Sequence, residues 1–148
     1  MTWATDRLDV IKSGKVDAPP VVRTLKLGLL DDWSEGIARK RWMPSDDVLN
    51  GDGSMFGGYI AALADQMLAF AAMTVVPDGS AFRTVNLQVQ FFKVGRGHAL
   101  DIEARVTAQS KSMIAVEADF TRDDGELIAR ASAQQMVVPF PGGGQGTA

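Results

Sequence analysis

The feature that most constrains the fold of this chain is the segment from Tyr59 to about Thr74. It is made largely of alanine, leucine, methionine, phenylalanine and isoleucine, and it contains neither glycine nor proline. These residue types favour a helix, and the apolar residues continue almost all the way round it. Such a helix must be buried on most sides, so the rest of the chain has to supply a surface that covers it.

The sequence around this helix alternates with a period of two, which is typical of half-buried strands. One strand is expected before the helix and four after it, the last two joined by the turn RDDGE. We therefore predict an α+β fold in which one antiparallel sheet wraps around one long buried helix. The four later strands are expected to form a meander. The expected strands are residues 34–42, 82–92, 99–107, 112–121 and 127–138.

In the expected strand 82–92, simple alternation separates two faces. The apolar face contains Val85 and Leu87, and the polar face contains Thr84 and Asn86.

The two ends of the chain differ from this central part. Residues 1–32 are read as a helical lead-in and loop, with one helix that ends near Ser13 and a breaker at 17–20. Residues 33–138 form the predicted globular domain. Residues 139–148, which are rich in glycine, are predicted to be a flexible tail.

Composition excludes several classes of function. The net charge of -3 is spread along 148 residues, so no surface for nucleic acid or membrane is expected. There is no cysteine and only one histidine, His98, so neither a metal site nor a cofactor is expected. No basic segment followed by an apolar signal core begins the chain, and we expect a cytoplasmic protein.

One carboxylate, Asp65, interrupts the apolar helix. A charged group is costly to bury unless it is paired, and burial raises the pKa of a carboxyl toward the range that is useful to a general base. A solvent-facing aspartate at the edge of the helix, or one bound to a backbone group, is an equal alternative on the pattern alone.

The motif around this aspartate resembles the hotdog-fold acyl-CoA thioesterases of the phenylacetate-pathway and 4-hydroxybenzoyl-CoA type. The resemblance rests on Asn50, on Gly57 and Gly58, on Asp65 in the helix, and on the next strand, and it extends from about residue 33 to 138. Phe56 stands where this family has a histidine, and Val94 stands where many relatives have proline. These are the two departures from the pattern.

The resemblance implies a hydrolase that cleaves an acyl-CoA thioester, with Asp65 as base or nucleophile. Backbone N–H groups at Gly57 or Gly58 are suited to hold the oxyanion, because first-turn amides of a helix lack an internal acceptor. Asn50 is expected to orient the carbonyl or the water. Thr84 matches a hydroxyl position of the family and is expected to hold Asp65 or the attacking water; an ordinary strand threonine is the alternative.

Helix geometry adds a constraint on this site. Gly57 and Asp65 are eight positions apart, which is roughly 12 Å along a helix at 1.5 Å per residue. One thioester carbon cannot touch both groups, so the site is expected to combine two subunits of a homodimer, as in the resembled family. Association of two dimers into a homotetramer is the further expectation.

Cations in turns are the candidates for holding the CoA phosphates. Lys111, with Ser112 beside it, is favoured over Arg96, and a solvated surface charge is the alternative for each. Phe56 is a further substrate-binding candidate. His98 is read as an exposed turn residue.

Two classes of function remain open from the sequence. The first is the thioesterase, and the second is a non-catalytic hotdog domain that binds acyl-CoA or acyl carrier protein as a sensor or scaffold. Asp65 favours the enzyme, whereas the missing histidine keeps the second class open. The dehydratase branch of the fold is disfavoured, because its histidine and acid pair cannot be built from His98 alone.

Overall fold

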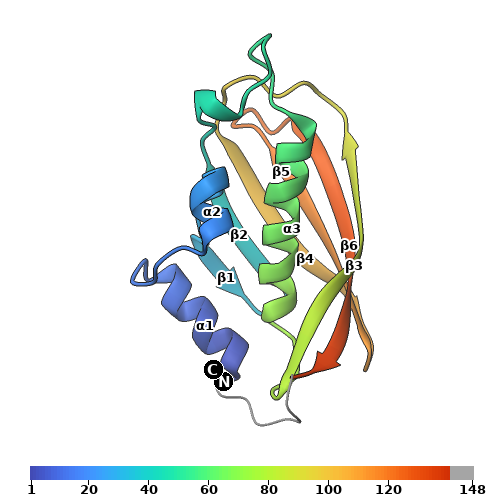
Figure 1. The fold of residues 1–148 in the computed structure, drawn as a ribbon. Coiled ribbons are helices and arrows are strands. Elements are labelled where there is room, and N and C mark those ends of the chain that lie inside the picture. Colours follow the sequence, from blue (N-terminus) through green and yellow to red (C-terminus); the bar gives the residue numbers. More distant parts are fainter. Residues whose placement is uncertain (141–148) are drawn as a thin grey trace.

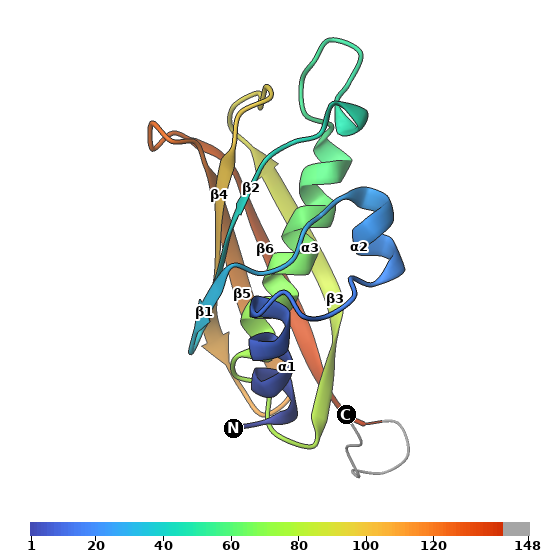
Figure 2. The same ribbon diagram turned by 90° about the vertical axis from the view of Figure 1, so that its left-hand side faces the viewer.

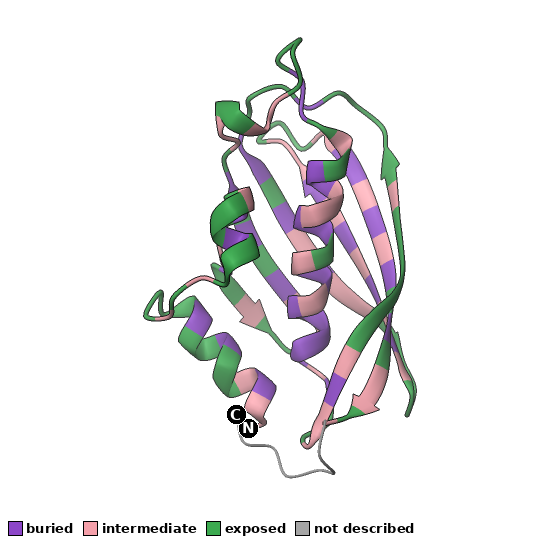
Figure 3. Cartoon of the chain, viewed as in Figure 1, coloured by how far each residue is buried: buried purple, intermediate pink, exposed green. Residues whose placement is uncertain are grey.

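The structure is a computed structural model that describes residues 1–140. A six-stranded antiparallel sheet curves around one central helix, α3, which spans Gly57–Met73 (Figure 1). This is the predicted arrangement of one sheet wrapped around one long buried helix. Buried residues occur along α3 from its first turn, at Tyr59, to its last residue, Met73. Figure 3 shows buried segments over the whole length of the helix.

The N-terminal segment forms two short helices that lie beside α3 (Figures 1 and 2). The first, α1, spans Trp3–Lys12 and begins at a reciprocal capping box between Thr2 and Thr5, which satisfies two otherwise free N–H groups. Its end confirms the predicted stop near Ser13. The second helix, α2, spans Pro20–Leu25 and was not predicted. Its first residue is the proline read as a breaker, and proline is favoured in the first turn of a helix.

The strand predicted before the central helix is confirmed as β2, Ile37–Trp42, with Ala38 and Trp42 buried. It pairs with β1, Asp32–Ser34, through a turn in which Gly36 has a positive φ of 79°. A short 3-10 helix at Asp46–Val48 follows in the loop that leads to α3. The four strands after α3 are β3 (Ser80–Phe91), β4 (Leu100–Gln109), β5 (Met113–Thr121) and β6 (Leu127–Pro139).

The predicted four-strand meander is wrong in one respect. The sheet order is β1-β2-β4-β5-β6-β3, so β4, β5 and β6 form a meander but β3 pairs with β6 at the far edge. The reason is the connection 92–99, which is longer than the two-to-five-residue loops of ordinary hairpins and carries the chain across to the other side of the sheet. The edge strand is therefore β3, whose other side has no partner strand among residues 1–140.

The predicted faces of β3 are also wrong at one end. Thr84 pairs with Gln135 and Asn86 pairs with Gln134, so Val85 is the extra residue of a β-bulge. The bulge changes the alternation and puts Thr84 on the same inner face as Leu87. This inner face is less covered than a half-buried strand predicts, because Leu87 and Phe91 on it are 36% and 52% exposed.

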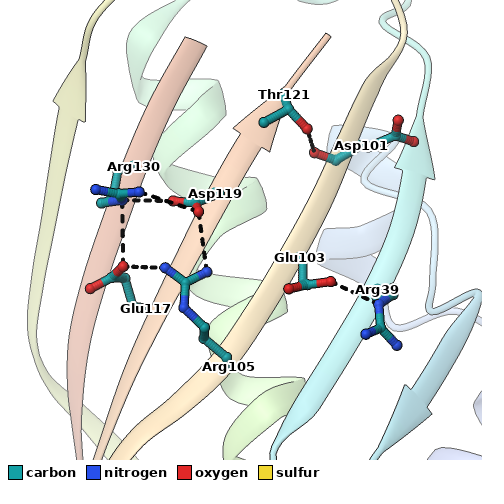
Figure 4. A network of polar contacts seen from close by, with 8 residues as sticks. All are labelled: Arg39, Asp101, Glu103, Arg105, Glu117, Asp119, Thr121 and Arg130. Carbon is teal, nitrogen blue, oxygen red and sulfur yellow. Dashed lines mark hydrogen bonds and ion pairs between the residues drawn. The ribbon is translucent and has the colours of Figure 1, made fainter. Parts of the chain in front are cut away.

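The face of the sheet turned away from α3 is covered by ion pairs rather than by a second apolar layer (Figure 4). Arg105 pairs with Glu117 and with Asp119, and Arg130 pairs with Asp119 at 2.7 Å and with Glu117 at 3.4 Å. Partial burial opposes ionisation of Asp119, but hydrogen bonds and charges from Arg130 and Arg105 outweigh it and lower the pKa of this carboxyl. These cross-strand pairs tie β4, β5 and β6 together.

The tail predicted over 139–148 lies mostly outside the described residues, which include only its first two positions. Pro139 is the last residue of β6, and the ring of Phe140 packs edge-on against Trp3 with centroids 5.1 Å apart. Within residues 1–140, no helix combines the length and the apolar character needed to cross a bilayer.

One cation, Lys40, lies inside the core with only 4% of its surface exposed. Its ammonium group donates to the carbonyl oxygen of Leu27 at 2.6 Å and to the side-chain oxygen of Gln66. The amide nitrogen of Gln66 in turn donates to the carbonyl of Gly28 at 2.7 Å. This network joins β2, α3 and the segment after α2.

Burial lowers the pKa of Lys40 from 10.5 to about 7, although the charge of Asp31 acts in the opposite direction. Between these two values the unfolded chain holds a proton that the folded chain has released. The free energy of unfolding should therefore rise with pH between about 7 and 10, by on the order of 1 kcal/mol per pH unit from this group. Below pH 7 this contribution to the slope disappears.

The measurement is urea unfolding at pH 7, 8 and 9 for the wild type, for Lys40→Met and for Lys15→Met, which removes an exposed lysine. Lys40→Met should flatten the rise, whereas Lys15→Met should keep it. Equal slopes in all three proteins would contradict the assignment.

Candidate active site

The candidate site is built around three hydrogen-bonded side chains, each from a different helix or strand. Asp65 lies on the exposed strip of α3 that faces β3, and the Thr84 hydroxyl is 3.1 Å from its Oδ1. The same hydroxyl is 2.9 Å from Oε1 of Gln135, which is on β6 and is fully buried. The structure thus brings Asp65 and Thr84 together.

The chemistry of these groups determines which of them donates and which accepts each hydrogen bond. The Asp65 carboxylate can only accept, so Thr84 uses its single hydroxyl proton on Asp65 and must itself accept from Gln135. Among residues 1–140, Nε2 of Gln135 is the buried side-chain nitrogen without a partner. Turning this amide over gives Thr84 the donor it needs, and an amide oxygen and nitrogen are exchanged on such hydrogen-bond grounds. Gln135 then holds Thr84, and Thr84 holds Asp65.

The expectation of a desolvated aspartate is wrong for the single chain. Asp65 is exposed, as in the solvent-facing alternative, and it lies on a strip of α3, with Gly58, Ala62 and Ala69, that is at most partly covered. That strip adjoins the uncovered apolar face of β3. A surface that covers β3 would also cover Asp65.

The second part of the site is the N-terminal end of α3. The residue before the helix, Phe56, provides no side-chain cap, and within residues 1–140 the Gly57 and Gly58 N–H groups have no acceptor. Both glycines are closely packed: a Cβ on Gly57 would lie 3.2 Å from Cζ of Phe91, and one on Gly58 would lie 2.8 Å from Cε1 of Phe56. A cavity of about 310 Å³ adjoins Gly57 and Phe91.

The loop before α3 contains Asn50, which is exposed and lies at the same end of the molecule as Gly57. Its side-chain nitrogen donates to the Ser54 hydroxyl at 2.9 Å, so its amide closes the loop. The Ser54 hydroxyl and N–H both donate to Asp52, and these bonds lower the pKa of the Asp52 carboxyl. Arg96 donates to the Asp52 carbonyl at 3.3 Å, which places Arg96 at this end too.

The two parts do not meet within one chain. Gly57 and Asp65 lie on one continuous helix, eight residues apart, so roughly 12 Å of helix axis separates them. Five of the candidate residues gather at one end of α3: Asn50, Phe56, Gly57, Gly58 and Arg96. Asp65 and Thr84 lie near the middle of the helix.

The lysine favoured for holding the CoA phosphates, Lys111, lies at neither of these two places. Lys111 is exposed in the β4–β5 turn, where the Ser112 carbonyl accepts from Val137 N–H at 2.9 Å. Arg96 precedes β4 and Lys111 follows it, so the length of that strand, roughly 30 Å at 3.3 Å per residue, separates them. Within one chain these two cations cannot hold the same phosphate.

The structure also shows the position of the single histidine and the distribution of possible metal ligands. His98 is exposed in the β3–β4 connection, as predicted. Within residues 1–140, no group of three or more His, Cys, Asp or Glu side chains gathers as a metal site requires.

Sequence reasoning missed Gln135. Its signal was present: it occupies an inward position of β6, in register with Ala131 and Ala133, where alternation otherwise places only small apolar residues. A polar residue at such a position needs a buried partner.

Comparison with known proteins places these features in a family. The model of the Thioesterase superfamily matches residues 52–129, a span that contains α3, Asp65 and Thr84. A search of curated proteins found no match.

Solved structures share the fold. A phenylacetic acid degradation-related protein of Ralstonia eutropha JMP134 is 25% identical, with a TM-score of 0.76 over 87% of this chain and 98% of that chain. A thioesterase of Haemophilus influenzae is 13% identical, with a TM-score of 0.77 over 89% and 90% of the two chains. The smu.793 protein of Streptococcus mutans UA159, bound to acetyl CoA, is 22% identical, with a TM-score of 0.68 over 74% and 87%.

These likenesses confirm the predicted hotdog arrangement, in which an antiparallel sheet packs around one long helix. The family match covers more than half of the chain and includes both the helix start at Gly57 and the aspartate at its centre. The chain belongs to the thioesterase superfamily.

Proposed function

We propose that this protein hydrolyses acyl-CoA thioesters, with Asp65 as the base or nucleophile and with Gly57 and Gly58 N–H groups of a partner subunit as oxyanion donors. The observation that carries the proposal is the hydrogen bond from Thr84 to Asp65 on the open strip beside β3. It holds a carboxylate in place at a surface where a second subunit can bring the donors.

The chemistry assigns each group a task. Thioester hydrolysis needs an attacking oxygen and a stabiliser for the oxyanion that forms on the carbonyl carbon. Asp65 either removes a proton from water or attacks directly. The first-turn amides of α3 carry the positive end of the helix dipole and have no internal acceptor, so they suit the oxyanion. Asn50 holds the loop that leads to these amides.

A homodimer accounts for the uncovered surface. The edge strand β3 has an unpaired side and an exposed apolar inner face, and such edges favour pairing with another strand. A twofold axis pairs two copies of one edge strand antiparallel, so each α3 start lies toward the other subunit's central region. This brings Gly57 of one subunit toward Asp65 of the other, which the length of α3 prevents within a single chain.

The same twofold symmetry can bring Arg96 of one subunit near Lys111 of the other. In an antiparallel pair, the end of one subunit that carries Arg96 lies toward the end of its partner that carries Lys111. Both are then available to the phosphates of one CoA, with Lys111 favoured and Ser112 beside it. Phe56, 58% exposed at the helix start, is suited to contact the substrate.

The comparisons support CoA as the carrier of the acyl group. The class of the acyl group is inferred from the resemblance to phenylacetate-pathway thioesterases. The S. mutans protein binds acetyl CoA, and the R. eutropha protein is related to phenylacetic acid degradation. We infer an acyl group of the aromatic or fatty class. We also infer that the protein is cytoplasmic, that a homodimer is its smallest active unit, and that two dimers associate into a homotetramer. A hydrolysis screen over a panel of acyl-CoAs with a thiol-trapping dye tests the activity.

The alternative is a hotdog domain that binds acyl-CoA or acyl carrier protein without turnover. The observation in its favour is Phe56, which occupies the position of the family histidine next to the oxyanion donors. It predicts acyl-CoA binding with no release of free CoA in the screen.

The first activity prediction concerns the carboxylate. Asp65→Asn should keep the fold, because the amide has nearly the same shape, and should lower turnover by at least about a hundredfold, the scale of losing a positioned base. Glu35→Gln, which neutralises an exposed carboxylate in the β1–β2 turn, is the control. A folded Asp65→Asn protein with wild-type turnover would remove Asp65 from the mechanism.

The second prediction concerns Thr84 as a positioning residue. Thr84→Val removes the donor to Asp65 without changing the size of the side chain, and hydrogen bonds to charged groups contribute about 1.5–3 kcal/mol. We expect kcat to fall roughly tenfold or more, with KM nearly unchanged. Thr84→Ser should restore most of the rate. A serine variant as slow as the valine variant would point to packing instead.

The third prediction tests the shared site. Asp65→Asn subunits are co-expressed with Gly57→Val subunits, whose added side chain blocks the helix-start amides. Each parent homodimer should be inactive, whereas a purified heterodimer should regain about half of the wild-type activity, because one of its two sites is intact. Inactive heterodimers that form normally would overturn the two-subunit arrangement.

A further inference from the structure

A second cavity lies beside the candidate site and none of the groups above uses it. It has a volume of about 450 Å³ and lies among α1, the segment around α2, the second half of α3 and the start of β3. Volumes of this size are within the range of about 300–1,000 Å³ that small-molecule sites occupy.

Asp65 and Thr84 do not line the cavity, but residues next to them on the same two elements do. On α3 its wall includes Ala69, one turn beyond Asp65, and on β3 it includes Phe82, the inward residue before Thr84. The two elements run antiparallel, so both steps lead in the same direction, toward the C-terminal end of α3. A group bonded to a carbonyl held at Asp65 can therefore extend between α3 and β3 into the cavity.

The chemistry of the lining selects an apolar occupant. The buried walls are aliphatic or aromatic, with Ile11 and Val22 from the N-terminal segment facing Phe70 and Met73 of α3. Gln66 also borders the cavity, but Lys40 and the Gly28 carbonyl already occupy its two amide atoms. The charged side chains that border it, Arg7, Asp17 and Arg83, are all exposed residues.

The N-terminal wall is held firmly in place. The Trp3 indole N–H donates to the Ser80 carbonyl at 2.8 Å, which ties the start of α1 to the start of β3. Farther along α1, Asp9 accepts from the Trp33 indole at 2.9 Å, and Lys12 pairs with Asp32 at 2.6 Å. These contacts fix α1 over the cavity at both ends.

From this geometry we propose that the cavity holds the acyl group of the substrate, and that the group is apolar and larger than acetyl. Its outer wall comes from residues 3–22, which lie outside the span matched by the family model. The N-terminal segment therefore sets which acyl group the thioesterase accepts. This inference rests on the proposed hydrolysis at Asp65, and the experiment below separates the two.

The first arm measures turnover of acetyl-, butyryl-, octanoyl- and phenylacetyl-CoA. The wild type should prefer the larger acyl groups. Ala69→Phe, which fills the cavity beyond Asp65, should keep acetyl-CoA turnover within about twofold and lower octanoyl-CoA turnover at least tenfold. Ala108→Phe, a matched change at an exposed position of β4, should leave the profile unchanged.

The second arm does not depend on hydrolysis. Because Trp3 lines the cavity, an octanoate with bromine on its last carbon should quench part of the tryptophan fluorescence of the wild type. The quenching should be lost in Trp3→Phe and in Ala69→Phe, and kept in Ala108→Phe.

The outcomes distinguish the two proposals. If the wild type is active and Ala69→Phe shows the same acyl-CoA profile and the same quenching as the wild type, the cavity assignment is overturned. The proposed hydrolase activity is then unaffected. Quenching specific to Trp3 in a protein that cleaves no acyl-CoA would support the acyl site and overturn the hydrolase.

Discussion

The structure depends on the burial of α3 by a sheet that covers all but one strip of it. Apolar side chains on most sides of this helix leave water only if other elements cover it, and β2, β3, β4, β5, β6 and α1 all pack against it. One strip of the helix stays open. Asp65 occupies that strip, so the same packing that forms the core also leaves the one carboxylate of the helix accessible.

A single irregularity in the edge strand brings a hydroxyl group to that carboxylate. The bulge at Val85 turns Thr84 inward, where its hydroxyl reaches Asp65 on one side and Gln135 on the other. Without the extra residue, regular alternation would point Thr84 away from α3. Bulges often occur at sheet edges and beside active sites, where they redirect one side chain.

The N-terminal segment adds a second layer to this family core. Its helices bury Leu8 and Val22 near α3, and the Lys40 and Gln66 network joins the chain after α2 to the sheet and helix. A buried ammonium group is costly to desolvate, so its two hydrogen bonds hold this segment in one position. The cavity beside Asp65 has a defined wall for that reason.

The sequence alone determined the long buried helix, most of the strands and the motif of Asn50, Gly57 and Asp65, because periodicity and residue type are local properties. It could not determine that β3 pairs with β6, that Val85 bulges, or that Pro20 begins a helix. Those outcomes depend on which distant segments compete for the same partner. Gln135 meets Thr84, and Ala69 and Ile11 line one cavity, only after the sheet has closed around α3, so the tertiary structure alone decided which of these residues lie together.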